Sequence, residues 1–325
     1  MKFLRFNRRA MVLGVMALAA CAASAQQSFK TIRLMVGYSA GGPVDQAARL
    51  LAPALGKELG LSIIVENKTG ANATLAGDAV AKAKPDGSML WFAASPTITI
   101  GPNVMRKMPF DPAKDLTPVA PVLSYYNVLV IHKGLAFQSV KNLVDYAKAN
   151  PGKLTYGSAG TGGSNHLSGE LFADRTGTKL IHVPYKGNAP AMTDVIGGTL
   201  TMMFDIVGSA RPFISNGNVR ALAVTSPKRN PSLPNVPTMA ESGLPGLAGF
   251  DVGGWYGVYA PPGAPEALVA RYNQAINKVL AQPEVKERLQ EMGYELWSGA
   301  PKLLADRGNK ERAMWATVTK GIEIE

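Results

Sequence analysis

The chain has 325 residues, a formal net charge of +11 and a single cysteine, Cys21. A chain of this length is longer than a single domain of ordinary size, so we expect two domains. One cysteine excludes an internal disulfide framework. The basic residues are scattered rather than massed beside aromatic residues, which argues against nucleic acid as a partner.

The N-terminus has the pattern of a secretory signal peptide, which is set aside before the fold is considered. Four cations precede an apolar run over 11–20, and small residues follow it. Ala23-Ser24-Ala25 fits a signal-peptidase site, whereas 18–21 resembles a lipobox that would place lipid on Cys21. We favour cleavage after Ala25, which removes residues 1–25 and lowers the charge from +11 by four cations to +7. The protein is then periplasmic; the alternative is a lipoprotein anchored through Cys21.

Short β-type runs alternate with helical patterns in the first part of the mature chain. The predicted elements are a strand over 32–37, a helix over 47–59, a strand over 63–66, a helix over 75–83 and a strand over 89–93. This alternation is typical of a parallel sheet with helices on both faces. A proline-rich passage over 96–121 interrupts the pattern.

A second alternating series follows. Strands are predicted at 128–132, 154–156, 180–184, 200–204 and 221–225, with helices at 140–148, 167–175, 189–196 and 212–215. An irregular connector leads to a strand over 255–260, expected to pair beside 128–132, and then to helices over 266–281 and 283–292 that pack on the first lobe. The prediction is an α/β fold with a ligand cleft between two lobes, 26–126 plus 251–325 and 127–250.

A glycine turn over 38–45 joins the first strand to the first helix. Pro43 presets the first helical turn, and the backbone N–H groups at such a helix start are unpaired. A carboxylate or phosphate is therefore expected to bind there without a lysine or arginine, and the turn contains neither.

The loop over 157–166 is predicted to be the equivalent corner of the second lobe. Its glycines allow the backbone to approach a ligand, and the hydroxyls of Ser158, Thr161 and Ser164 add short donors. The alternative is a surface turn in which Ser164 caps the following helix.

Three further corners carry polar side chains. Lys186, beside Tyr185, is the one cation expected near a bound anion, the alternative being a solvated turn residue. Asp205 ends an apolar strand and either orients ligand donors or caps the next helix. Ser95 follows another strand. Because the carboxyl ends of strands line the ligand crevice of open α/β sheets, these corners are expected to converge.

Several enzymatic signatures are absent from the sequence. The loop over 157–166 departs from the dinucleotide and P-loop patterns, and no Gly-x-Ser-x-Gly motif surrounds a serine of that loop. The three histidines have no metal-ligand spacing. No cofactor and no metal is therefore predicted, and the rival hypothesis is a hydrolase that uses Ser164, His166 and Asp205.

Seven ordered blocks resemble those of one family. They are 41–45 with Ala48-Arg49, 65–71, 109–112 with Asp115, 157–167, 183–187, Phe204-Asp205, and Pro234-x-x-Pro237-Thr238-x-x-Glu241-x-Gly243. Together they resemble the tripartite tricarboxylate transporter substrate-binding family, also called the Bordetella uptake gene (Bug) family of periplasmic solute receptors. Two departures stand out: Ser39-Ala40 replaces the usual prolines, and Asn72-Ala73 replaces small glycines.

The resemblance implies a non-enzymatic, two-lobed receptor of the type II, Venus-flytrap kind. It would close on a small carboxylated solute, namely a di- or tricarboxylate, an acidic amino acid or an aromatic carboxylate. Its partners would be inner-membrane permease subunits, or alternatively a membrane sensor protein. The predicted ligand-binding residues are Tyr38, Ser39, Ala40, Gly41, Gly42, Asp45, Ser95, Ser158, Thr161, Gly162, Ser164, Asn165, His166, Tyr185, Lys186 and Asp205.

Overall fold

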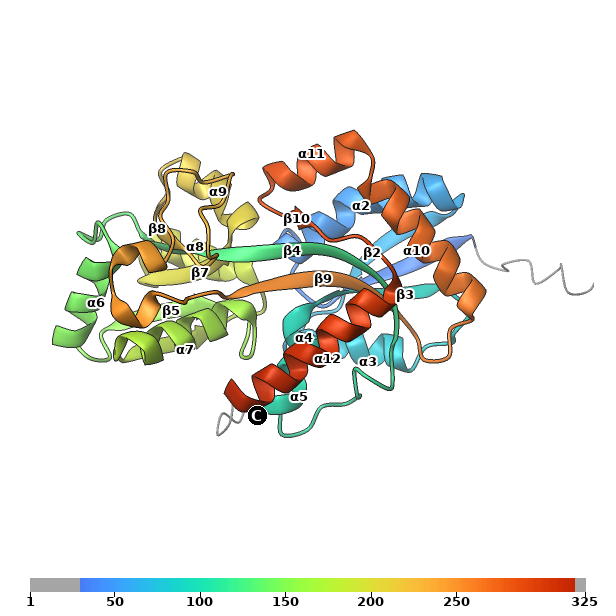
Figure 1. The fold of residues 1–325 in the computed structure, drawn as a ribbon, viewed down its shortest axis with the longest axis horizontal. Helices are drawn as coiled ribbons and strands as arrows, with labels where there is room; N and C mark the ends of the chain where they lie inside the picture. Colours follow the sequence, from blue (N-terminus) through green and yellow to red (C-terminus); the bar gives the residue numbers. More distant parts are fainter. Residues whose placement is uncertain (1–29, 319–325) are drawn as a thin grey trace, which may run out of the picture. The chain divides into compact units, whose positions relative to one another are not determined.

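A computed structural model describes residues 30–318, so the predicted signal peptide, both processing sites and Cys21 lie outside the described residues. The first elements are β1 (Thr31–Val36), α2 (Pro43–Leu59), β2 (Ser62–Asn67), α3 (Thr74–Ala81), β3 (Met89–Ala94), α4 (Ser95–Thr99) and α5 (Gly101–Val104). Strand β1 lies between β2 and β3 and runs parallel to both (Figure 1). The predicted alternation of strands and helices is present.

Helix α2 begins at Pro43, the residue predicted to preset its first turn, and extends four residues ahead of the apolar pattern that starts at Ala47. Proline is favoured there because its missing N–H would have no helical partner in any case. The helix ends at Gly60, whose left-handed backbone (φ 67°) suits glycine. Its buried residues recur at helical spacing and are Pro43, Val44, Asp45, Ala47, Ala48, Leu51, Ala52 and Leu55.

Strand β4 (Thr117–His132) connects two groups of strands. Residues 117–126 pair with β9 (Gly253–Ala260), and residues 127–132 pair with β7 (Met202–Ile206) and β8 (Val219–Val224). The strand begins inside the proline-rich passage. Its register with β9 shifts beside Pro118 and Pro121, as expected where a proline lacks the N–H that a ladder needs.

The predicted pairing of the strand over 255–260 with 128–132 is wrong. Strand β9 runs antiparallel to the earlier part of β4, with Trp255 opposite Ser124. The physical reason is competition for edges, because β7 and β8 already occupy both edges of residues 128–131. We call β1, β2, β3, β9 and β10 the first group, and β5 to β8 the second group.

The second group follows the chain from β4. Its elements are α6 (Val140–Ala149), β5 (Leu154–Ser158), α7 (Ser164–Thr176), β6 (Leu180–Pro184), α8 (Asn188–Gly197), β7, α9 (Val207–Ser215) and β8. Strand β5 lies between β6 and β7 and is parallel to both. Two short 3₁₀ turns, η1 (Ala240–Ser242) and η2 (Pro245–Leu247), lie in the predicted irregular connector.

The chain returns to the first group through β9. It continues through α10 (Glu266–Leu280), α11 (Pro283–Glu291), β10 (Glu295–Leu296) and α12 (Pro301–Val318). Helix α10 packs on α2 and β4, and α12 packs on α4 and β4. Helix α12 was not predicted. In Figure 1, α2 and α10 cover one face of the first group of strands, while α3 and α12 lie on the other face.

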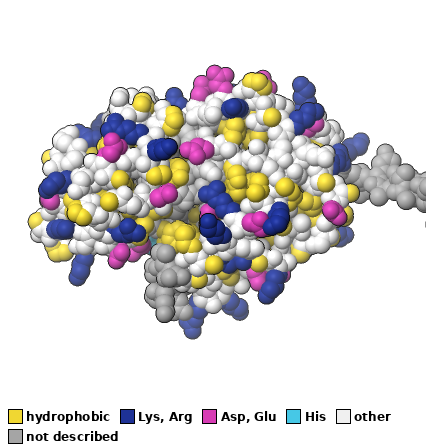
Figure 2. Space-filling view, viewed as in Figure 1, with side chains coloured by type: hydrophobic (Ala, Val, Ile, Leu, Met, Phe, Trp, Pro, Cys, Tyr) yellow, Lys and Arg dark blue, Asp and Glu magenta, His cyan; other side chains and the backbone are white. Residues whose placement is uncertain are grey.

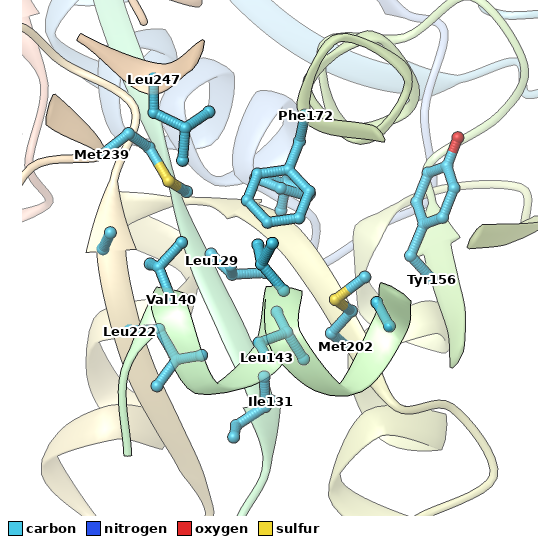
Figure 3. Packing of buried hydrophobic residues seen from close by; sticks show 14 of the residues in the cluster. Leu129, Ile131, Val140, Leu143, Tyr156, Phe172, Met202, Leu222, Met239 and Leu247 are labelled. Atoms are coloured by element: carbon cyan, nitrogen blue, oxygen red, sulfur yellow. The ribbon is translucent and has the colours of Figure 1, made fainter. Parts of the chain in front are cut away.

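A large apolar cluster holds the second group together. Figure 3 shows Leu129 and Ile131 of β4 and Leu143 of α6 facing Phe172 of α7 and Met202 of β7. Packed strands and helices of this kind form one α/β core, and they hold the loops at the strand ends in place.

The surface carries no single charged patch on the face seen in Figure 2, where lysine and arginine are mixed with acidic and apolar side chains. Within residues 30–318, no helix has the length and apolar character needed to cross a membrane.

Candidate functional site

A small cavity lies where loops from both groups meet. Its volume is about 180 Å³, below the range of about 300–1,000 Å³ that holds drug-sized ligands. Its twelve lining residues are Gly37, Tyr38, Gly70, Ala71, Asn72, Ala73, Met105, Ala159, Gly160, Thr161, Tyr185 and Lys186. Most follow the carboxyl ends of the parallel strands β1, β2, β5 and β6, which is where α/β sheets bind ligands.

Lys186 is the only charged residue among the twelve. The Tyr185 hydroxyl donates to Asp194, and burial together with that carboxylate raises the pKa of Tyr185 to about 12. Tyr185 therefore stays neutral, and its proton is directed away from a solute. The cavity offers a cation and no carboxylate, which suits an anionic guest.

The loop after β1 is organised by Asp45, which is 2% exposed. Its carboxylate accepts hydrogen bonds from the Gly41 amide (2.9 Å), from Asn67 Nδ2 (2.8 Å) and from Arg49 Nε (2.9 Å). Burial opposes ionisation of this group, but the three donors hold its pKa below the ordinary value.

The amides of this loop differ from the sequence-based expectation. The Gly41 amide is bound by Asp45, and the Gly42 amide donates to the Ser39 carbonyl at 3.2 Å. These two N–H groups are therefore satisfied within the loop rather than unpaired. Of the residues predicted in this loop, Tyr38 lines the cavity, whereas Ser39, Ala40, Gly41, Gly42 and Asp45 do not.

The two groups touch closely beside the cavity. A Cβ atom at Gly187 would lie 2.1 Å from Ser39 Oγ, so only glycine fits against this serine. Ser39 Oγ is itself buried without a hydrogen-bond partner. The loop after β1 and the loop after β6 thus form a direct contact across the site.

The loop after β5 rests on two histidines whose rings are in contact, at an angle of 35° to each other. The rings of His166 and His182 lie 4.1 Å apart, His182 Nε2 is 2.6 Å from Ser158 Oγ, and the Gly162 amide donates to His166 Nδ1 at 3.1 Å. Burial lowers the pKa of both histidines to about 4, and for His182 the neighbouring His166 adds to this effect. Both rings are neutral near pH 7, and His166 supports the loop as an acceptor.

The remaining predicted residues lie behind the cavity lining. Asn165 donates to the Phe204 carbonyl, and Ser95 Oγ accepts from the Trp255 amide at 3.1 Å. Asp205 is fully buried; its Oδ1 accepts from Asn188 and from the Ile206 amide, whereas its Oδ2 has no partner. Burial raises the pKa of Asp205 to about 6. From the predicted set, the structure brings together at the cavity Tyr38, Thr161, Tyr185 and Lys186.

The three residues of the hydrolase hypothesis form no relay. His166 Nδ1 is occupied by the Gly162 amide, and Asp205 pairs with Asn188 rather than with a histidine. Nucleophilic catalysis needs a base within hydrogen-bond reach of the nucleophile and a third group that orients the base. Among residues 30–318 there is also no group of three or more acidic, histidine or cysteine side chains arranged to hold a metal ion.

Sequence reasoning missed most of the cavity's small residues. Gly37, Met105, Ala159 and Gly160 have no side chain that signals binding. In the turn over 70–73, Gly70 and Ala71 were noted only as the end of a family block, and Asn72-Ala73 only as a departure from the family. The position of that turn could have indicated a role in binding. It follows strand β2 in the same way as the predicted ligand loops follow β1 and β5.

A wider groove of about 1630 Å³ runs between α2, α9 and α11. It contains none of the predicted site residues, and both cations and acids line it. The small cavity is therefore the candidate site.

Comparison with known proteins identifies the class and then the family. The structure resembles that of the periplasmic binding protein BugD (33% identity, TM-score 0.86, 91% of this chain and 99% of that chain). It also resembles R. palustris Rpa4515 with adipate (34%, 0.86, 89% and 96%) and MatC from Rhodopseudomonas palustris with bound malate (33%, 0.84, 89% and 98%). The fold is that of an α/β periplasmic binding protein, as predicted.

The family model described as the tripartite tricarboxylate transporter family receptor matches residues 47–320. This chain belongs to that family, and the resemblance drawn from the sequence is confirmed. The family consists of solute-binding receptors rather than enzymes, so the prediction of a non-enzymatic protein is confirmed and the hydrolase hypothesis is set aside.

Proposed function

We propose that this protein is a periplasmic receptor that captures a small carboxylated solute for uptake through a tripartite tricarboxylate-type transporter. The observation that carries the proposal is Lys186, the single charged group in a cavity lined by loops of both strand groups. Two relatives with TM-scores of 0.84 and 0.86 carry malate and adipate. The solute class is thus a small di- or tricarboxylate, with acidic amino acids and aromatic carboxylates as the other candidates.

Binding is proposed to close two lobes, 26–126 plus 251–325 and 127–250. The change of partners along β4 between Tyr126 and Asn127 supports a hinge at this boundary. Leu167 of α7 packs against Ile100, at the end of α4, and Val104 of α5, both in the other lobe, a contact that opening would separate. The conformation described here is then the closed one.

The membrane partner is proposed to be the permease of the same transporter. A sensor protein is the alternative, and co-purification of the membrane partner separates the two. Export by a signal peptide cleaved after Ala25 is part of this proposal, with lipidation of Cys21 as the alternative. The mass of the mature protein distinguishes these two processing routes.

Thermal melts against mono-, di- and tricarboxylates test the proposal. The protein is first unfolded and refolded to remove endogenous solute. A solute at 100 times its dissociation constant should stabilise the folded state by about 2.7 kcal/mol. An unchanged melting temperature with every member of the panel would contradict the proposed function.

A further inference from the structure

A strained turn borders the cavity. Ala71, Asn72 and Ala73 have φ values of 45°, 49° and 67°, and within residues 30–318 they are the only residues other than glycine with positive φ. This backbone is costly for alanine and less so for asparagine, whereas glycine adopts it freely. Such strain persists only where the surroundings impose it, and it concentrates at ligand-binding and catalytic sites.

The neighbours of the turn hold it in place. Thr74 donates to the Ala71 carbonyl through its amide (3.1 Å) and its hydroxyl (2.8 Å). Thr97 Oγ1 donates to the Asn72 carbonyl at 2.7 Å. On the other side, a Cβ atom at Gly37 would lie only 2.1 Å from Ala73 Cβ, so the turn packs directly on β1's end. The backbone of Asn72 is fixed before any solute arrives.

The side chain of Asn72 is oriented as well. The buried Tyr38 hydroxyl donates to Asn72 Oδ1 at 3.0 Å, which fixes the plane of the amide. In residues 30–318 no acceptor binds the Nδ2 group, and this nitrogen is not among the buried atoms without a partner. Because Asn72 lines the cavity together with Thr161 and Lys186, two N–H donors are left for a guest.

We propose that Asn72 is a specificity-determining residue that donates hydrogen bonds from Nδ2 to a second oxygen group of the solute. The inference rests on the proposed function, in which Lys186 meets the first carboxylate. If Asn72 binds a second oxygen group, the protein should bind dicarboxylates and hydroxycarboxylates more tightly than monocarboxylates of the same chain length. The small apolar neighbours Ala71, Ala73, Met105 and Ala159 offer no side-chain polar group that would replace this donor.

The test compares Asn72→Gly with the parent protein by titration calorimetry. The probes are adipate and malate, with hexanoate and butyrate as monocarboxylates of equal chain length. Asn72→Gly should weaken the dicarboxylates by about 10- to 100-fold, the range of one hydrogen bond to a charged group, and change the monocarboxylates by less than about twofold. The unliganded variant should remain folded, because glycine relieves the strained backbone while the buried Tyr38 hydroxyl loses its acceptor, two effects of opposite sign on stability.

Two further variants separate recognition from backbone strain. Ala71→Gly relieves a similar φ without removing an amide, so its affinities should stay within about twofold of the parent. Asn72→Asp keeps the shape and replaces both donors by a negative oxygen, so it should lose dicarboxylate binding at least as strongly as Asn72→Gly.

The outcomes distinguish this inference from the proposed function. If the parent binds no carboxylate, the proposed function fails and the inference fails with it. If the parent binds dicarboxylates and Asn72→Gly binds them equally well, only the assignment of Asn72 is overturned. A parent that prefers monocarboxylates, or an Ala71→Gly variant as weak as Asn72→Gly, also overturns it.

Discussion

The contact of Leu167 with Ile100 and Val104 allows the effect of a substitution on lobe closure to be distinguished from its effect on folding. Leu167 is 4% exposed, and its apolar cluster consists of Ile100, Val104 and the partly buried Met105 and Trp315, all from the other lobe of the proposed division. If solute binding forms this cluster, Leu167→Ala should weaken affinity without destabilising the unliganded protein. Burial of a leucine side chain contributes about 1.5–3 kcal/mol, which corresponds to an increase of about 10- to 150-fold in Kd.

Leu143→Ala is the matched control. Leu143 is fully buried within the second group, where its loss leaves a cavity in a core that exists with or without solute. We expect it to cost about 2–5 kcal/mol of unfolding free energy and to leave the Kd of the folded protein nearly unchanged. Calorimetric titration with the best carboxylate of the panel gives Kd, and melts without solute give stability. A Leu167→Ala protein as unstable as Leu143→Ala, with unchanged Kd, would refute the reasoning.

Two other predictions concern charge. Lys186→Met should raise the Kd for a dicarboxylate by about tenfold, with a smaller effect at high salt. Lys179 is an exposed lysine outside the cavity lining, so Lys179→Met should leave the Kd unchanged. Equal effects of the two substitutions would contradict the proposed role of Lys186. In the folded protein the pKa values of His166 and His182 are about 4, below the ordinary value of 6.5. As the pH falls, the unfolded state therefore binds protons before the folded state does. The free energy of unfolding should decrease as the pH drops from about 6.5 to 4. His182→Asn should reduce this slope in melts across that range, and an identical slope would argue against the neutral pair.

Much of the fold could be predicted because local sequence patterns determine where its strands and helices lie. The alternation of strands and helices followed from periodicity, and Pro43 marked the first helix start. The partner of β9 could not be predicted in the same way. Pairing depends on which edges of β4 remain free, and β7 and β8 fill those of residues 128–131. That information is distributed over the whole chain.

The site was predicted in part for a similar physical reason. Tyr185 and Lys186 line the cavity, and both could be singled out beforehand because polar residues after a strand are visible in the sequence. The contact between the rings of His166 and His182 was not predicted, since the two residues come from α7 and β6 and meet only in the folded protein. The turn at Asn72 was equally hidden, because a left-handed backbone without glycine has no local signature.

The late return of β9 has a consequence for the order of folding. Strand β3 pairs on one side with β1, close in sequence, and on the other with β9, where Ala94 lies opposite Tyr256. The second group is continuous in sequence and can assemble as soon as its residues are available. The first group has to wait for the last quarter of the chain, and non-local pairing of this kind folds slowly. Until then the edge of β3 is open to pairing with other chains, so aggregation through this edge is a risk during folding.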